Sequence, residues 1–222
     1  LMSKELQRRI LSSLILIPIV IFFIFQETLF FGFFLSIVFL ATSYEWIKMN
    51  KTDSLKVIGV CYLFFAFVSA YLLREKFSLG LFILVLIICI FTDLGGYIFG
   101  KIFKGPKLIK ISPKKTYTGA LGGFILSLVA ALIYSKYTLT GALTNLNLQI
   151  LTGMGINKTY LLFILVISFI SQIGDLIISY FKRLSKVKDT GNLLPGHGGL
   201  LDRLDGIIFA IPISYFLLTY LK

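Results

Sequence analysis

Long apolar stretches separated by short polar ones run through the whole chain. The hydrocarbon core of a bilayer is about 30 Å thick, and a helix needs roughly 20 apolar residues to cross it. The windows that reach or approach this length are residues 10–26, 29–48, 57–73, 78–100, 118–137, 159–181 and 200–221. The pattern predicts an all-α polytopic integral membrane protein with about seven transmembrane helices. The count rises to eight if the fourth window breaks near Gly95–Gly96.

The first window is short and contains Pro18. A proline inside a helix removes a hydrogen bond and favours a kink. Basic residues precede the apolar run, as in a signal peptide, but no small-residue cleavage site follows. We expect an uncleaved first helix that is kinked or dips into the bilayer.

Composition supports the membrane assignment. The chain is 57% hydrophobic and only 14% charged, and its mean hydropathy is +0.92. Soluble domains are about half apolar and about a quarter charged. No polar stretch is long enough to encode a separate soluble domain, so residues 1–222 are expected to form a single membrane domain.

The basic residues predict the orientation of that domain. The net charge is +12, which in a soluble protein would suggest a nucleic-acid partner. In membrane proteins, Lys and Arg accumulate in cytoplasmic loops instead. With a cytoplasmic N-terminus and seven alternating helices, 17 of the 22 Lys and Arg residues lie on the cytoplasmic side. This arrangement predicts cytoplasmic loops at 101–117 and 182–199. It also explains the positive charge without a nucleic-acid partner.

Acidic residues are scarce, with ten in the whole chain, so their positions are informative. Asp93 is in the fourth window and Asp175 is in the sixth. Charged residues within membrane spans are costly and usually mark functional sites. Ser171, Asp175 and Ser179 recur every four residues, which places them on one helix face. Asp202 and Asp205 are three residues apart at the expected start of the last helix, again on one face.

These carboxylates are accompanied by groups suited to phosphate. Mg²⁺ is commonly bound by one or two carboxylates, water and substrate phosphates, and Lys and Arg bind phosphate oxygens. Gly196, Gly198 and Gly199 would let backbone amides approach an anion closely. Lys114 and Lys115 precede an expected helix start near Gly119, where phosphate oxygens could also be received. The pattern predicts a metal-dependent phosphate site facing the cytoplasm.

Two glycine motifs have simpler explanations. Residues 95–101, GGYIFGK, match the spacing of a P-loop, but Ile102 replaces the required Ser or Thr and no strand precedes. The pairs Gly96/Gly100 and Gly119/Gly123 are better explained by close helix packing.

Residues 179–205, SYFKRLSKVKDTGNLLPGHGGLLDRLD, resemble the signature of the phosphatidate cytidylyltransferase (CDP-diacylglycerol synthase) family. The signature is S-x-φ-K-R-x4-K-D-x-small-x2-φ-P-x-H-G-G-φ-x-D-R-φ-D, where φ is apolar, and every specified position is met. SQIGDL at 171–176, the intramembrane Asp93 and ISPKKT at 111–116 are also similar to the family. One departure is Thr118, because family members commonly carry Glu at this position.

The resemblance implies the reaction CTP + phosphatidate → CDP-diacylglycerol + pyrophosphate, dependent on Mg²⁺, with one or two metal ions. It divides the chain into N-terminal spans at 1–90 and a catalytic half at 91–222. The implied metal ligands are Asp175, Asp202 and Asp205, and the other implied catalytic residues are Lys182, Arg183 and His197. The implied substrate-binding residues are Asp93, Lys114, Lys115, Ser179, Lys188, Asp189, Gly198, Gly199 and Arg203.

This interpretation places the protein in the cytoplasmic (inner) cell membrane as a multi-pass enzyme. Its partners would be CTP, bilayer phosphatidate and membrane lipids, and a homodimer remains open. An alternative enzyme is a CTP-dependent polyprenol or phytol kinase, and a non-enzyme alternative is an ion-coupled transporter that uses Asp93 and Asp175. Residues 202–206, DRLDG, match the beginning of the motif of CDP-alcohol phosphatidyltransferases. The match then fails, because Phe209–Ala210 stands where that motif has Ala-Arg.

Overall fold

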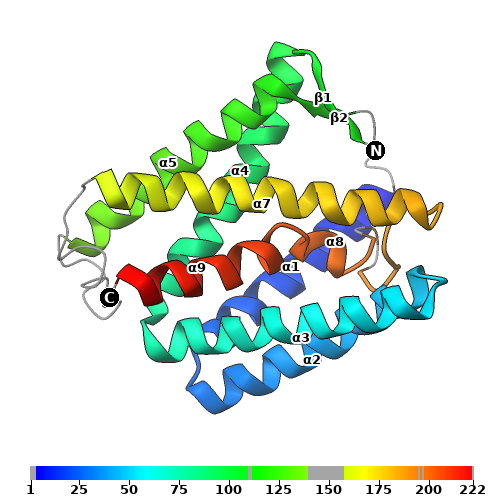
Figure 1. The fold of residues 1–222 in the computed structure, drawn as a ribbon, viewed down its shortest axis with the longest axis horizontal. Helices are drawn as coiled ribbons and strands as arrows, with labels where there is room; N and C mark the ends of the chain where they lie inside the picture. The colour runs from blue at the N-terminus through cyan, green and yellow to red at the C-terminus, as the bar shows by residue number, and fades with distance from the viewer. Residues whose placement is uncertain (1–3, 110–111, 140–157, 195, 197, 222) are drawn as a thin grey trace. The chain divides into compact units, whose positions relative to one another are not determined.

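The structure is a computed structural model and describes residues 4–109, 112–139, 158–194, 196 and 198–221. The chain forms two compact units, and two of its helices pass from one unit into the other. The first unit comprises Leu1–Tyr71 and Phe181–Leu204, and the second comprises Leu72–Tyr180 and Asp205–Lys222. Figure 1 follows the chain through both.

The first unit contains helices α1 (Lys4–Phe25), α2 (Thr28–Met49) and most of α3 (Asp53–Lys76). Pro18 lies inside α1. The indole nitrogen of Trp46 donates to the Leu55 carbonyl at 2.9 Å, and Gly59 leaves room for the indole ring. These contacts pack α2 against α3, as Figure 1 shows. The end of α7 and the short helix α8 (Leu201–Leu204) complete the unit.

The second unit is centred on the crossing of α4 (Leu79–Phe103) and α5 (Tyr117–Leu139). A methyl group at Gly95 would lie 2.3 Å from the Gly122 carbonyl oxygen, and one at Gly119 would lie 2.7 Å from the Gly96 carbonyl oxygen. The helices therefore touch backbone to backbone. This confirms the predicted role of the glycine pairs. Residues 95–101 are helical throughout, so they form no P-loop.

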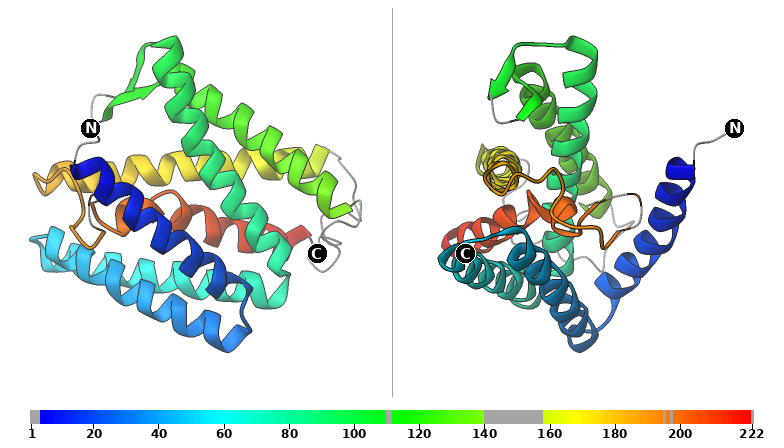
Figure 2. Two further views of the ribbon diagram at one scale, coloured as in Figure 1. Left: turned by 180° about the vertical axis from the view of Figure 1, so that it is seen from behind. Right: turned by 90° about the vertical axis from the view of Figure 1, so that its right-hand side faces the viewer.

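An antiparallel hairpin joins these two helices. Strands β1 (Lys107–Ile109) and β2 (Ser112–Thr116) pair with Lys107 opposite Thr116 and Ile109 opposite Ser112. Both views in Figure 2 show the hairpin at the shared end of α4 and α5. We expected residues 101–117 to be a loop. Instead α4 continues to Phe103, and the remainder is mostly β-structure.

Helices α7 (Lys158–Leu184) and α9 (Ile207–Leu221) belong largely to the second unit. A methyl group at Gly206 would lie 2.4 Å from the Ser171 hydroxyl, so the start of α9 lies directly against α7. The expected last helix at 200–221 is in fact two helices. Helix α8 ends at Leu204, a turn covers residues 205–206, and α9 begins at Ile207.

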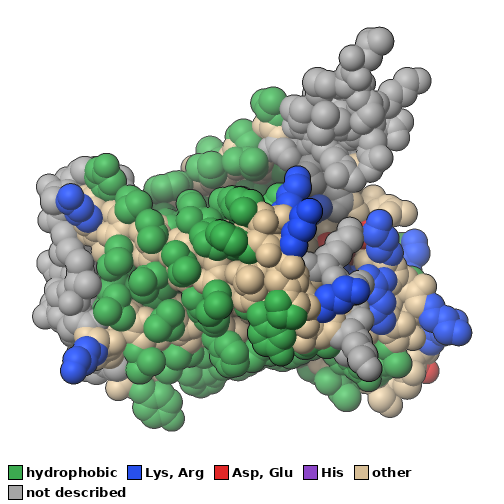
Figure 3. Space-filling model, turned by 90° about the horizontal axis from the view of Figure 1, so that it is seen from above, with side chains coloured by type: hydrophobic (Ala, Val, Ile, Leu, Met, Phe, Trp, Pro, Cys, Tyr) green, Lys and Arg blue, Asp and Glu red, His purple; other side chains and the backbone are tan. Residues whose placement is uncertain are grey.

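The helices have the length and surface of a membrane protein. Among the described residues, five helices are long and apolar enough to cross a bilayer, namely α2, α3, α4, α5 and α7. Helices α1 and α9 contribute shorter apolar stretches, Leu14–Phe25 and Ile207–Tyr220. Helix α4 runs unbroken through Gly95 and Gly96. Large apolar side chains such as Leu29 and Phe33 are exposed, and Figure 3 shows many hydrophobic side chains on one face. The protein is an all-α, multi-pass membrane protein.

Candidate active site

A pocket of about 240 Å³ lies within the second unit and contains three of the predicted site residues. Asp93 comes from α4, Lys115 from β2 and Asp175 from α7. Lys115 forms an ion pair with Asp175, and about a quarter of each side chain is exposed. The Ser179 hydroxyl donates to Asp175 Oδ1 at 3.3 Å. Residues 60 positions apart in sequence are thus brought together as a charged cluster among apolar helices.

The hairpin and the start of α5 hold Lys115 in this pocket. Thr116 follows Lys115, and its hydroxyl accepts a hydrogen bond from the Gly119 amide at 3.1 Å. Side chains in this position satisfy the free amides at the start of a helix. The Thr118 hydroxyl accepts from the Gly105 amide at 3.3 Å, which ties α5 to the end of α4. Thr118, where family members commonly carry Glu, therefore has a structural contact here.

The glycine crossing brings α4 and α5 close enough to share the pocket with α7. Gly96 and Gly119 both line the pocket, together with Gln172. The Gln172 side-chain amide donates to the Ala120 carbonyl at 3.4 Å. Asp93 is exposed in the pocket wall. Larger residues at the crossing would separate α4, which carries Asp93, from α5, which begins two residues after Lys115.

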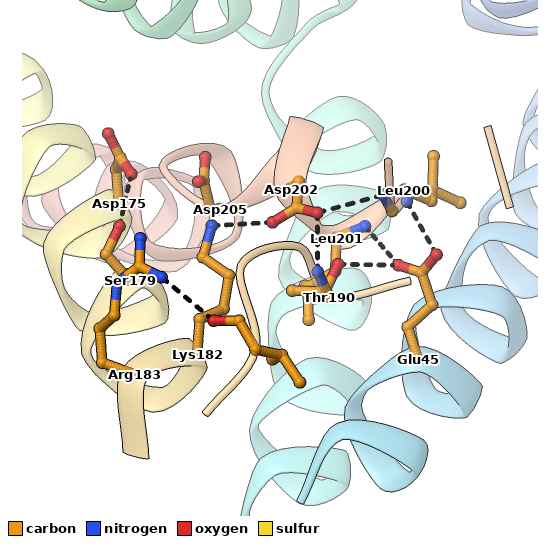
Figure 4. Close-up of polar contacts among 12 residues, drawn as sticks. Glu45, Asp175, Ser179, Lys182, Arg183, Thr190, Leu200, Leu201, Asp202 and Asp205 are labelled. Atoms are coloured by element: carbon orange, nitrogen blue, oxygen red, sulfur yellow. Dashed lines mark hydrogen bonds and ion pairs between the residues drawn. The ribbon is translucent and has the colours of Figure 1, made fainter. Parts of the chain in front are cut away.

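In the first unit, Lys182 and Asp202 form a second charged pair, shown in Figure 4. Lys182 Nζ donates to Asp202 Oδ1 at 2.8 Å, and the side chains are 12% and 10% exposed. Asp202 Oδ2 accepts from the Thr190 amide at 2.8 Å and the Gly199 amide at 3.1 Å. Residues 185–200, between α7 and α8, are called the glycine loop below. Asp202 connects the end of α7 with two points of this loop, Thr190 and Gly199.

The glycine loop begins with a reversal at the end of α7. Lys186 has a positive φ of 58°, and the Val187 amide donates back to the Lys182 carbonyl at 2.9 Å. This is a common helix-ending arrangement, in which glycine usually occupies the left-handed position. The Arg183 guanidinium donates to the Val187 carbonyl at 3.2 Å. The predicted phosphate-binding residues of this region that are exposed are Arg183, Lys188 and Arg203.

Two further predicted residues of the glycine loop lie close to each other. Gly198 has a positive φ of 88°, a backbone conformation that glycine adopts without strain. A methyl group there would lie 3.4 Å from Asp189 Cβ and 3.4 Å from Asp202 Oδ2. The Leu194 amide donates to the Gly198 carbonyl at 3.0 Å. His197 lies outside the described residues, and so does the side chain of Lys114.

Glu45 is a site residue that the sequence interpretation missed. It lies in α2, is only 1% exposed, and accepts hydrogen bonds from the Leu200 and Leu201 amides at 3.0 and 2.8 Å. The Thr190 hydroxyl donates to it at 3.2 Å (Figure 4). The rule that singled out Asp93 and Asp175, an acid inside an apolar window, would also have found Glu45.

Asp205 differs from its predicted position. We expected it to share one face of the last helix with Asp202, but Asp202 is in α8 and Asp205 lies in the turn before α9. Its carboxylate accepts from the Gly206 amide at 2.9 Å and is buried. A methyl group at Gly174 would lie 2.8 Å from the Asp205 carbonyl oxygen, so this turn lies against α7 one residue before Asp175. Gly206, in the same turn, lies directly against Ser171, and glycine is a poor helix former.

The carboxylates present are chemically suited to Mg²⁺. Asp175 forms an ion pair with Lys115, and Asp202 forms one with Lys182. Each carboxylate therefore already has a positive charge beside its oxygen atoms. Among the described residues, no group of three His, Cys, Asp or Glu side chains converges on one point. Mg²⁺ does not require one, because water and substrate phosphates commonly fill most of its ligand positions.

These helices and charged clusters define a multi-pass membrane protein with a pocket lined by charged residues. Comparison with known proteins identifies its family. Residues 53–221 match the cytidylyltransferase family, and the chain belongs to that family. This range contains the pocket and the glycine loop, whereas Glu45 lies outside it.

Curated relatives share much of the chain. Phosphatidate cytidylyltransferase of Rickettsia felis is 33% identical over 223 residues, which cover 97% of this chain and 93% of the relative. The protein of the same name from Bacillus subtilis is 37% identical over 164 residues, or 73% of this chain and 55% of the relative. The one from Staphylococcus aureus is 35% identical over 185 residues, or 81% of this chain and 66% of the relative.

Proposed function

We propose that the protein is a phosphatidate cytidylyltransferase that converts CTP and phosphatidate to CDP-diacylglycerol and pyrophosphate in the cytoplasmic membrane. The observation that carries this proposal is the family match over 53–221. It is supported by a relative named phosphatidate cytidylyltransferase that aligns with 97% of the chain. The pocket of Asp93, Lys115 and Asp175 supports it, because these charged groups lie beside helices α4 and α7, which are long and apolar enough to cross a bilayer.

The reaction requires positioning more than proton transfer. An oxygen of the phosphatidate phosphate attacks the α-phosphorus of CTP, the bond between the α- and β-phosphates breaks, and pyrophosphate leaves. The nucleophile is already an anion, so no strong base is needed. The barrier comes from bringing anions together and from charge that develops on pyrophosphate. Fixed cations and hydrogen-bond donors lower such barriers.

The predicted site residues take four roles under this proposal. Cationic side chains hold phosphate oxygens, and the candidates are Lys114, Lys115, Lys182, Arg183, Lys188 and Arg203. Asp175 and Asp202 bind Mg²⁺, with Asp205 as a further ligand, and bound Mg²⁺ would neutralise phosphate charge. His197 with Gly198 and Gly199 would shape the nucleotide pocket, and Asp93, Ser179 and Asp189 would complete the substrate contacts.

Labelled CTP tests the reaction directly. The purified protein in detergent would receive Mg²⁺, phosphatidate and CTP that carries ³²P at either the α- or the γ-position. We expect the α-label in the lipid product and the γ-label in pyrophosphate. The γ-label in a lipid would instead indicate a CTP-dependent lipid kinase. No lipid product from either label, beside an active control enzyme, would reject the proposal. Chelation of Mg²⁺ should abolish product formation, and its later addition should restore it.

A further inference from the structure

Glu45 is a buried acid whose carboxylate is satisfied by hydrogen bonds rather than by a cation. It is 1% exposed, and within the described part of the chain no Lys or Arg forms an ion pair with it. Burying a charged carboxylate is costly unless it is hydrogen-bonded. Both of its oxygens accept such bonds, from the Leu200 amide on Oε1 and from the Leu201 amide and the Thr190 hydroxyl on Oε2.

Glu45 and Asp202 accept hydrogen bonds from neighbouring groups of the same two segments, Thr190 and residues 199–201. Thr190 donates its amide to Asp202 and its hydroxyl to Glu45. At the other end of the glycine loop, the Gly199 amide donates to Asp202, whereas the next two amides donate to Glu45. The two carboxylates thus bind the same two segments from different sides.

The backbone closes tightly around Glu45. A methyl group at Gly191 would lie 2.5 Å from Glu45 Oε1, and one at Gly199 would lie 2.8 Å from Glu45 Oε2 and 2.0 Å from the Thr190 hydroxyl. Real side chains do not approach so closely, so only glycine fits at either position while the carboxylate is present. Glycines at positions 191 and 199 of the loop therefore make room for the Glu45 side chain of α2.

We propose that Glu45 is a positioning residue of the cytidylyltransferase reaction, which holds Thr190 and residues 200–201 together so that Asp202 keeps its orientation. The inference rests on the proposed function for its consequence in catalysis. Its geometric part, that Glu45 fixes the loop, rests on the hydrogen bonds alone.

The geometry requires a carboxylate rather than an amide. Each oxygen of Glu45 faces a backbone N–H donor. In Glu45→Gln, an NH₂ group replaces one carboxylate oxygen. This NH₂ group would face a backbone N–H, which is also a donor, so either the Leu200 or the Leu201 amide loses its acceptor. The substitution hardly changes side-chain volume, so the loss of hydrogen bonding is isolated from packing. Thr190→Val removes only the hydroxyl contact and preserves side-chain shape.

The test compares kcat and KM of the wild type, Glu45→Gln, Thr190→Val and Glu27→Gln in detergent. Glu27 is a matched control because it is exposed at the other end of α2. A displacement of about 1 Å at a reacting group can cost about 10²-fold in rate. We expect kcat to fall by about this factor in Glu45→Gln and less in Thr190→Val, with Glu27→Gln near wild type.

A double-mutant cycle separates positioning from stability. If Glu45 acts through Asp202, adding Glu45→Gln to Asp202→Asn should cause little further loss, because residues in one network are not additive. Rates are normalised to folded, monodisperse protein. The same fold-loss in both backgrounds, or a wild-type kcat in Glu45→Gln with only reduced thermal stability, would overturn the inference.

Hydrogen–deuterium exchange provides a readout that needs no activity. In Glu45→Gln, amides of residues 199–201 should exchange at least about tenfold faster than in wild type, while α4 and α5 remain unchanged. If the wild type makes no CDP-lipid, the proposed function fails, and this result still decides the geometric part. Unchanged exchange at 199–201 would contradict it. If Glu45→Gln does not fold, the same comparison is made with Thr190→Val.

Discussion

Asp202 lies in α8, and its carboxylate has three partners, a lysine on one oxygen and two backbone amides of the glycine loop on the other. Asp175 has a lysine and a hydroxyl. Both are ordered by neighbouring groups, so their orientation does not depend on the substrate alone. This organisation suits carboxylates whose task is to place a metal and phosphates.

We expect Asp175→Asn and Asp202→Asn each to lower kcat/KM by about 10²-fold or more, because an amide no longer provides the negative charge that Mg²⁺ requires. This corresponds to roughly 3 kcal/mol of transition-state stabilisation. The measurement is CDP-lipid formation by purified variants, with exposed Glu75→Gln as the control. Near-normal rates in the two variants would refute their role as metal ligands but would leave the reaction itself standing.

Lys182 is expected to matter for stability as well as for chemistry. Its pair with Asp202 is largely buried, with side-chain exposures of 12% and 10%. Lys182→Ala would leave the Asp202 carboxylate without its cation, and such losses cost about 3–5 kcal/mol. Thermal unfolding in detergent should show a clear decrease for Lys182→Ala. Lys188→Ala is the control because Lys188 is exposed in the same loop. Equal stability of the two variants would show that the pair contributes little.

Among the elements, the crossing of α4 and α5 depends on individual glycines to different degrees. A methyl group at Gly95 would lie 2.3 Å from a backbone oxygen, whereas one at Gly96 would meet nothing nearer than 3.9 Å. Backbone oxygens cannot move aside as flexible side chains do. The two neighbouring glycines therefore provide a matched comparison.

Gly95→Ala should destabilise the protein by about 1–3 kcal/mol, as overpacking usually does. Gly96→Ala should be neutral or stabilising by up to about 1 kcal/mol, because alanine favours the helix. The measurement is the midpoint of thermal unfolding. Equal effects at the two positions would contradict the close backbone contact at Gly95. Activity is not the readout here, because Gly96 lines the pocket.

At this scale the sequence predicted the long helices well and the polar connections less well. Apolar windows located α2, α3, α4, α5 and α7 to within a few residues, because burial in lipid demands uninterrupted apolar length. The same windows could not show the turn at 205–206, because apolar length alone does not indicate where a helix is interrupted, and the contact of Gly206 with Ser171 is a tertiary one. The hairpin was missed because β1 has three residues and β2 contains Pro113.

The candidate site was also predicted unevenly. Asp93, Lys115 and Asp175 were found as separate signals, and the structure places all three in one pocket. The pairing of Lys115 with Asp175 could not be deduced, because it depends on how the hairpin folds back toward α7. Glu45 could have been noticed as an acid in an apolar window, but its contact with the glycine loop could not be predicted, because backbone amides are its main partners and leave no signal in the sequence.

For the whole molecule, the distribution of basic residues predicts that the hairpin and the glycine loop face the cytoplasm. Single cysteines at Lys104, Lys188 and Lys76 in a variant without Cys61 and Cys89 would test this. We expect an impermeant maleimide to label positions 104 and 188 only from the cytoplasmic side and position 76 only from the outside. All three positions are exposed. Labelling of 104 and 188 from opposite sides would reject the predicted topology.

The contact between Glu45 and the glycine loop affects where this protein can be shortened. The region that matches the family begins at residue 53, and a minimal version designed from that match would keep every predicted metal and phosphate residue. It would also discard α2, and with it the only acceptor that the structure gives, among the described residues, to the Leu200 and Leu201 amides. The start of the family match is therefore not the start of an independently stable part of the structure. A working truncation would have to begin before Thr28 and retain α2.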